Sequence, residues 1–223
     1  MKNAKNVCQI AVMVALIAGG KTAIAYIINI EIVTLLFVVF TLHFGFTKTF
    51  IASIIFVLIE ILIWGFMLWW VVLYFIHWPM LVAAIALVSL ITKKSFGKRK
   101  AKVESLSGQA LLFEESPSVM DANTSSSKNA QEENQVNKFA VIKTKTIVIA
   151  VIVAVALTAW FGVLSTLIEI SFANAIGSGM FWSMFYFRYA AGVPFFLTHI
   201  ISNAIVLPIL VPVLLKTLQR IKR

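Results

Sequence analysis

The chain has 223 residues, of which 61% are hydrophobic and only 13% are charged, and its formal net charge is +10. An ordinary soluble domain has roughly 45–50% apolar residues, so this composition excludes one and indicates an integral membrane protein. The positive charge does not indicate a nucleic-acid partner, because most basic residues flank apolar runs, which is the pattern that sets membrane topology.

Taken in chain order, the apolar runs predict an all-α fold of six transmembrane helices in one bundle. A helix needs about 20 mostly apolar residues to cross a bilayer. The predicted spans cover residues 7–20, 24–44, 49–69, 71–91, 146–168 and 190–214. The first run is short unless its helix continues past "GGKT". Its start imitates a signal peptide, but apolar sequence resumes at once, which favours a retained helix. The aromatic stretch "SGMFWSMFYF" predicts an interfacial segment before the last span.

A polar insert divides the chain into three parts. Residues 1–91 hold the first four helices, residues 92–145 form the insert, and residues 146–223 hold the last two helices and a basic tail. The insert opens with "KKSFGKRKAK" and continues through "NTSSSKNAQEENQVNK". Its low hydrophobicity and its Ser, Asn, Gln and Glu content predict a disordered cytoplasmic segment.

The basic residues predict that both termini lie in the cytoplasm. With six spans, that orientation places on the inside Lys2, Lys5, Lys48, the ten basic residues of the insert and the tail "KTLQRIKR". Only Lys21 and Arg188 then lie outside, in agreement with the positive-inside rule. The predicted location is therefore a cell membrane, with the lipid bilayer as the immediate partner.

Polar residues inside the spans are candidate functional residues, because ionisable groups in a bilayer are costly and usually face a cavity or a partner. His199 and Asn203 lie four residues apart in the last span, so they share one helix face. In this topology Glu60, His77 and this pair converge on the outer half of the bundle. A helix–helix hydrogen bond is the structural alternative for His199 and Asn203.

The acidic residues have a structural alternative as well. Glu31 or Glu60 could pair with Lys21, Lys48 or Arg188 and so hold helices together.

The aromatic stretch "WGFMLWWVVLYFIHW" has two interpretations. Its tryptophans, Trp64 and Trp69 among them, could line a site or could form an aromatic belt at the membrane interface. His77 near its end could be a ligand contact or a packing group at a helix end.

Several chemistries are excluded by missing motifs. The chain has no phosphate loop of the P-loop type, no H-E-x-x-H and no G-x-S-x-G. Cys8 is the single cysteine, and Asp121 in the insert is the single aspartate. We therefore expect no catalytic residues, no metal site and no cofactor, and a binding pocket open to the outside fits better than a channel.

Three motifs resemble the substrate-binding S-components of energy-coupling factor (ECF) vitamin transporters. They are "AVMVA" in the first helix, "NIEIVTLLFVVFTLHFG" in the second span, and "AGVPFFLTHIISNAIVLPILVP" in the last. The last block is similar to the family pattern Gly-x-Pro-Phe-x-x-x-His-x-x-x-Asn. Members of the family often have an Asp before the histidine, where this chain has Phe196.

The resemblance implies a transporter subunit that captures a vitamin outside the cell. Its implied partners are a membrane coupling (T) subunit and two cytoplasmic ATPase subunits. Small residues allow close helix approach, so Ala11, Ala15 and Ala18 are the expected docking face. The expected ligand-binding residues are Asn29, Glu31, Glu60, Trp64, Trp69, His77, Arg188, His199 and Asn203.

The ligand and the class of protein both have alternatives. The many aromatic residues suit a ring-bearing vitamin, with cobalamin favoured slightly over folate, pantothenate or a pyrimidine. Lys21 and Arg188 could meet a carboxylate or a phosphate on it. The alternatives to an S-component are a stand-alone secondary transporter, for which no inverted repeat is visible, and a membrane assembly protein whose insert recruits cytoplasmic partners.

Overall fold

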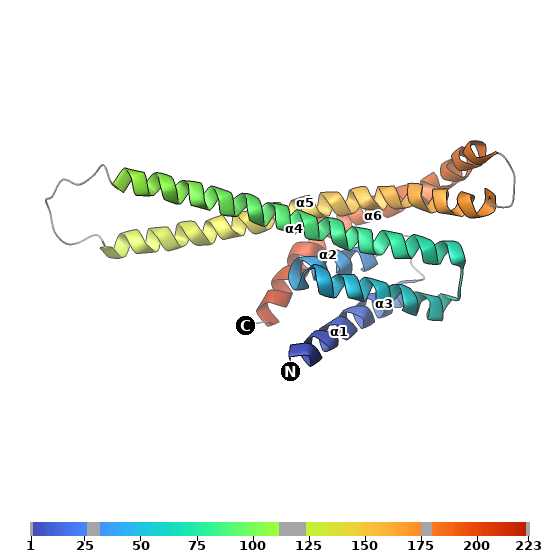
Figure 1. The fold of residues 1–223 in the computed structure, drawn as a ribbon, viewed down its shortest axis with the longest axis horizontal. Coiled ribbons are helices and arrows are strands. Elements are labelled where there is room, and N and C mark those ends of the chain that lie inside the picture. Colours follow the sequence, from blue (N-terminus) through green and yellow to red (C-terminus); the bar gives the residue numbers. More distant parts are fainter. Residues whose placement is uncertain (1, 26–31, 112–123, 175–179, 222–223) are drawn as a thin grey trace. The chain divides into compact units, whose positions relative to one another are not determined.

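The computed structural model describes residues 2–25, 32–111, 124–174 and 180–221, with side chains described for 4–25, 32–92, 94, 144–173 and 180–220. These residues form six α-helices without a strand (Figure 1). The helices are α1 (Lys2–Ala23), α2 (Ile32–Phe44), α3 (Phe46–Trp64), α4 (Leu68–Leu111), α5 (Thr124–Asn174) and α6 (Phe181–Ile221). The predicted all-α fold class is confirmed.

Five of these helices are long and apolar enough to cross a membrane. Among the described residues they are Ala4–Ala23, Phe46–Trp64, Leu68–Thr92, Thr144–Ala173 and Phe181–Arg220. The remaining helix, α2, is apolar but has 13 residues. Residues 26–31, which belong to the predicted span 24–44, lie outside the described residues. The first helix does continue past "GGKT", as far as Ala23.

The chain divides into two compact units. The first, unit 1, comprises Met1–Leu87 and Ala150–Arg223, and the second, unit 2, comprises Val88–Ile149. In unit 1, α1 packs against α2 and α3, and α2 packs against α3 and α6. Figure 1 shows both termini at the same end of this unit.

An aromatic cluster forms part of the core of unit 1. Phe37 of α2 lies with its ring centroid 5.8 Å from that of Phe56 on α3 and 5.3 Å from that of Trp78 on α4. All three side chains are almost completely buried. Trp78 is therefore a core residue that joins three helices, rather than a member of an interfacial belt.

Much of the outward surface of unit 1 is apolar. On α6, the exposed residues Ile201, Ile205, Ile209 and Val213 follow one another at a spacing of four. Leu62 on α3 is 83% exposed. Such continuous apolar faces are costly in water and suit contact with lipid.

The connections of α3 depend on glycine. Gly45 has φ 89° and separates α2 from α3, and Gly65 has φ 84° and ends α3. Side chains other than glycine rarely adopt such backbone angles. Because of the turn at Gly65, the third span ends at Trp64, several residues before the predicted end at 69.

The last helix is longer than predicted. The aromatic stretch before residue 190, expected as a separate interfacial segment, forms the first turns of α6, and the helix continues through Pro194, Pro208 and Pro212. Each proline removes one backbone donor, which membrane helices tolerate when other groups compensate. The Thr198 hydroxyl donates to the carbonyl oxygen of Phe195 at 2.8 Å, next to the first proline.

Unit 2 contains the distal part of α4 and the proximal part of α5. The two segments are joined by a hydrogen bond of 3.0 Å from Thr146 Oγ1 to Thr92 Oγ1. The helices extend through residue 111 and from residue 124, across much of the insert predicted to be disordered. The difference has a physical reason: starting a helix is costly, but extending an existing one is cheap, and beside its Ser and Asn residues the insert contains many Lys, Ala and Glu residues, which favour helix. Residues 112–123 lie outside the described residues.

Candidate binding pocket

Unit 1 contains a cavity of about 410 Å3 where α1 and α3 end and α4 begins. Its lining residues are Lys21, Ala25, Val57, Glu60, Ile61, Trp64, Gly65, Met67, Trp70, Val71 and Tyr74. Val57 and Glu60 are buried and form its base, whereas Trp64 and Met67 are exposed and lie at its rim. Pockets for small molecules usually measure roughly 300–1,000 Å3, so this cavity has the size of a ligand site.

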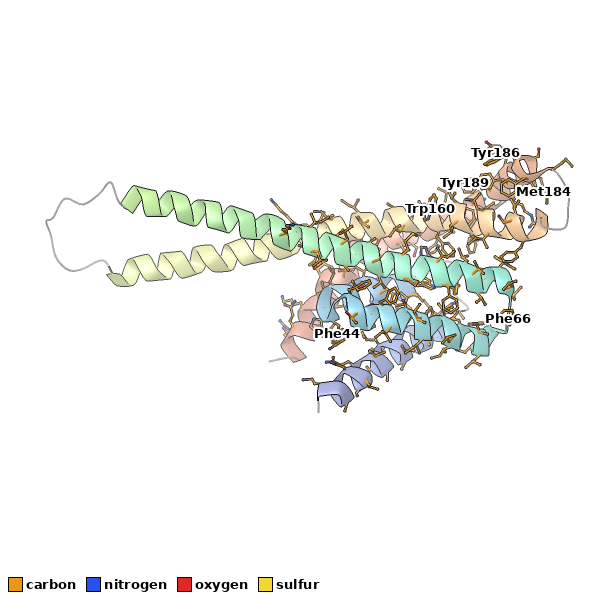
Figure 2. The ribbon with its side chains drawn as sticks, viewed as in Figure 1. Phe44, Phe66, Trp160, Met184, Tyr186 and Tyr189 are labelled. Carbon is orange, nitrogen blue, oxygen red and sulfur yellow. The ribbon has the colours of Figure 1, made fainter. Side chains whose placement is uncertain are left out.

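The rim is formed by the connection between α3 and α4. Only residues 65–67 separate the two helices, and Figure 2 shows Phe66 at this turn. Gly65 combines φ 84° with ψ 170°, and its N–H donates to the carbonyl oxygen of Ile61 at 3.0 Å. A backbone of this kind is essentially restricted to glycine. The position of the rim therefore depends on Gly65.

An ion pair lies at the base of the pocket. Lys21 Nζ at the end of α1 donates to Glu60 Oε2 on α3. The same ammonium donates to Tyr74 Oη of α4 at 3.2 Å and lies 4.7 Å from the centroid of the Tyr74 ring. Lys21 thereby links three helices. The structural alternative for Glu60, pairing with a basic residue, is therefore present, with Lys21 as the partner.

The second oxygen of Glu60 has different surroundings. Oε1 is buried and has no hydrogen-bond partner among the described residues. The side chain of Glu60 is 6% exposed, whereas that of Lys21 is 24% exposed. A buried carboxylate oxygen without a donor is costly, and native structures contain few such groups. Glu60 is thus the most polar and least satisfied group of the pocket.

Aromatic side chains form another part of the pocket wall, and one of them, Tyr74, contacts the ion pair through Lys21. The Trp70 ring meets the Tyr74 ring edge-on, with centroids 5.4 Å apart and an interplanar angle of 78°. Trp64 projects from the last turn of α3 and is 55% exposed. A wall of this type offers flat apolar surfaces on which a ring can stack. The arrangement can therefore bind a small planar molecule and orient it through a few polar contacts.

His199 and Asn203 lie in a different place, which we call the α5–α6 seam. The buried residues of α6 recur every four positions, as His199, Asn203, Leu207, Val211 and Leu215. This spacing confirms that His199 and Asn203 share one helix face. The face is the one that packs into the bundle, and neither residue lines the pocket.

Specific side-chain contacts join α6 to α5 at the seam. Asn203 Nδ2 donates to Thr158 Oγ1 at 3.0 Å, and both side chains are buried. The ring of His199 lies edge-on to Phe161, with centroids 5.9 Å apart. His77 of α4 contacts the same Phe161 ring at 4.7 Å. These three predicted ligand residues therefore form helix–helix contacts, as in the structural alternative for each of them.

Phe196 explains two glycines of the seam. A Cβ atom placed on Gly162 of α5 would lie 2.8 Å from Phe196 Cγ, and one placed on Gly192 would lie 2.7 Å from Phe196 Cε2. Such distances are shorter than real side-chain contacts. The ring thus fills space that exists only because both positions lack a side chain.

The remaining predicted ligand residues are dispersed. Arg188 pairs with Glu169 at 3.1 Å between Nη1 and Oε1, and its side chain is 55% exposed. Trp69 contacts Trp70, with ring centroids 4.6 Å apart, but does not itself line the pocket. Asn29 and Glu31 lie outside the described residues. Of the seven predicted ligand residues that the structure describes, Glu60 and Trp64 line the pocket.

The predicted docking face on α1 needs one correction. Ala11 and Ala15 are exposed, as expected, but Ala18 is buried. The reason is helical geometry, since Ala18 follows the buried residues Val14 and Ile17 on the inward side. The exposed small-residue stripe of α1 instead comprises Ala4, Cys8, Ala11, Ala15 and Gly19.

Several pocket residues are absent from the nine expected ligand-binding residues. Trp70 and Tyr74 belong to the aromatic residues that suit stacking on a ring-bearing ligand, but nothing in the sequence distinguishes them from Trp69. The available signal for the base was Lys21, a basic residue at the end of an otherwise apolar helix. The signal for the rim was Gly65, which stands between the apolar runs of the third and fourth spans.

No cluster of three or more His, Cys, Asp or Glu side chains suited to a metal ion occurs in the parts of the chain that the structure describes. Comparison of the chain with protein-family models, with curated proteins and with solved structures gave no match.

Proposed function

We propose that this protein is the substrate-binding membrane subunit of an ECF-type transporter and captures a vitamin or a related micronutrient for ATP-driven uptake. The observation that carries the proposal is the cavity of about 410 Å3 with a charged base and an aromatic wall at one end of unit 1. A pocket that combines a mostly apolar lining with a few polar groups is the usual form of a small-molecule site.

The two ends of unit 1 support an outward-facing pocket. The pocket residue Lys21 lies in the last turn of α1, at the opposite end of that helix from the N-terminus. Both termini lie together at the same end of unit 1 (Figure 1). The basic residues concentrate near the termini and in the insert, which by the positive-inside rule favours a cytoplasmic location for both ends. In that orientation the pocket collects its ligand from outside the cell.

The need for partner subunits follows from two further features. The chain has no P-loop motif for ATP hydrolysis, so active uptake requires an ATPase in another subunit. The exposed small-residue stripe of α1 permits a second helix to approach closely, as small residues do at helix–helix interfaces in membranes. We assign this stripe to contact with the coupling subunit.

The test is a binding screen with the purified full-length protein. One vitamin from a panel should quench tryptophan fluorescence saturably, because Trp64 and Trp70 both line the cavity. Uptake into cells should then require co-expression of a coupling subunit and two ATPases. If no vitamin binds and uptake proceeds without ATPases, the proposal is wrong.

A further inference from the structure

Glu60 has a carboxylate oxygen that the described part of the protein leaves without a donor. Oε2 accepts from Lys21, whereas Oε1 is buried with no hydrogen-bond partner among the described residues. The side chain is more than nine-tenths buried, at 6% exposure, and it lines the cavity. The oxygen itself is enclosed, so a donor on a bound ligand would satisfy it once the carboxylate turns toward the cavity, and the new bond would remove the cost of leaving the oxygen unpaired.

Lys21 places a donor next to that acceptor. An ammonium has three N–H groups, and here it donates to Glu60 and to Tyr74 Oη. Among the described residues, one N–H of Lys21 is therefore left for a ligand acceptor. The base of the pocket offers an acceptor and a donor side by side, which matches a ligand edge where an N–H adjoins a carbonyl oxygen or a ring nitrogen.

The charges at the base also select among ligands. Lys21 and Glu60 neutralise each other, so no net charge is needed on the ligand. A ligand that entered with its own carboxylate or phosphate would approach the buried Glu60 with a like charge. The ion pair therefore disfavours a ligand carboxylate or phosphate at Lys21, although the sequence alone suggests such a contact.

The shape of the pocket limits the size and form of the ligand. Trp64 and Trp70 offer planar surfaces from two helices, and the Tyr74 ring is already covered by Lys21. The volume of about 410 Å3 lies near the lower end of the range for small-molecule sites. A compound of one or two fused rings suits this space better than the macrocycle of a corrinoid.

We propose that the pocket binds a compact, planar nitrogen heterocycle whose N–H donates to Glu60 Oε1 while its neighbouring acceptor meets Lys21. The inference rests on the proposed function and names the ligand class for the same site. It replaces the slight preference for cobalamin that the aromatic content suggests.

The experiment measures tryptophan quenching of the full-length protein in lipid nanodiscs by probes of defined chemistry. Uracil and pterin carry an N–H beside an acceptor, 1,3-dimethyluracil has the same ring without an N–H donor, benzoate is an anionic ring, and cobalamin is a macrocycle. Uracil or pterin should bind saturably. Dimethyluracil should bind at least about tenfold more weakly than uracil, and benzoate and cobalamin should not compete.

Variants locate the effect at the base of the pocket. Glu60→Gln should weaken binding of the probe at least about tenfold, because the charge paired with Lys21 is lost and the amide replaces the carboxylate acceptor. Glu169→Gln is the matched control, since Glu169 pairs with Arg188 away from the pocket, and it should bind the probe like the parent protein. If Glu60→Gln does not fold, the comparison of uracil with its dimethyl derivative still tests the inference on the unaltered protein.

Different failures point to different conclusions. Equal binding of uracil and dimethyluracil, binding of neither uracil nor pterin, or tight Glu60-independent binding of cobalamin would overturn the heterocycle assignment. The last result would leave the proposed function intact. Failure of every vitamin to bind, together with uptake that needs no ATPase, would overturn the function itself.

Discussion

The pocket between α1, α3 and α4 and the α5–α6 seam both bury polar side chains among apolar helices, but the two regions use them differently. In the pocket, Glu60 borders a cavity of about 410 Å3 and keeps one oxygen without a donor in the described structure. In the seam, Asn203 bonds directly to Thr158, and the ring of Phe196 occupies the space left by two glycines. Polarity in a membrane helix therefore does not identify a site by itself; the space next to the polar group does.

The two regions are nevertheless connected through the core. Ring contacts lead from Tyr74 to Trp78 at 5.7 Å, from Trp78 to His77 at 4.8 Å, and from His77 to Phe161 at 4.7 Å. Phe161 contacts His199 of the seam. The following substitutions separate the roles of the pocket and the seam, and they are ordered by their expected effect on the free energy of unfolding.

The largest effect is expected for Lys21→Met. It removes the partner of a buried carboxylate, and breaking a buried ion pair in this way costs about 3–5 kcal/mol. The unfolding free energy in detergent should fall accordingly, and adding Glu60→Leu should recover part of the loss. Lys48→Met is the control, because Lys48 Nζ donates to the neutral amide oxygen of Gln9 at 2.6 Å rather than to a buried carboxylate. A loss no larger in Lys21→Met than in the control would contradict the importance of the pair.

A second, intermediate effect is expected in the seam for Gly162→Ala. The new methyl group would lie 2.8 Å from Phe196 Cγ, and overpacking of this kind costs about 1–3 kcal/mol. Ligand binding should change little, because neither residue lines the pocket. Gly19→Ala provides the comparison, since nothing lies within 4 Å of a Cβ atom there, and it should leave stability unchanged or slightly raised. Thermal unfolding of both variants measures the difference.

A smaller effect is expected for Asn203→Ala. It removes the hydrogen bond to Thr158, and such bonds between membrane helices contribute about 0.6–2 kcal/mol. Stability should fall by this amount while the ligand's Kd stays the same. Trp64→Phe should behave in the opposite way, weakening binding and leaving stability almost unchanged, because Trp64 is exposed at the rim. Weaker binding in Asn203→Ala without loss of stability would restore the seam as a ligand site.

No effect on unfolding is expected for Ala15→Trp, which alters the exposed small-residue stripe of α1. Ligand binding should also be retained, since Ala15 is remote from the pocket lining. Uptake in cells with the coupling subunits should be lost, because the indole prevents close approach of a second helix. Leu16→Trp, at an exposed position beside the stripe, should retain uptake. Normal uptake by Ala15→Trp would remove the assignment of this stripe to docking.

Much of the fold was predictable from the sequence. Long apolar runs dictate helices in a bilayer, because every backbone polar group must be satisfied within the segment. The all-α class, the position of most helices and the shared face of His199 and Asn203 follow from composition and period alone. The helical parts of the insert were not predicted, because a composition-based argument does not include the advantage of extending an existing helix.

The candidate site was predictable only in part. Glu60 and Trp64, chosen from the sequence as neighbours one turn apart, both line the pocket, and Lys21 was named as a possible partner of Glu60. The convergence of all polar residues on one region was not found, because helix rotation decides which side each residue faces. Ala15 lies four residues after Ala11 and shares its exposed face, whereas Ala18 lies three residues after Ala15 and faces the core.

The sequence by itself determined that this is a helical membrane protein and which residues are too polar to be left in lipid. Only the tertiary structure decided that Asn203 closes a helix interface while Glu60 borders a cavity. The physical reason is that burial of a polar group is a local property, but the presence of space beside it depends on how distant helices pack. Here the glycine at position 65 and the ends of three helices leave that space, whereas Phe196 fills it in the seam.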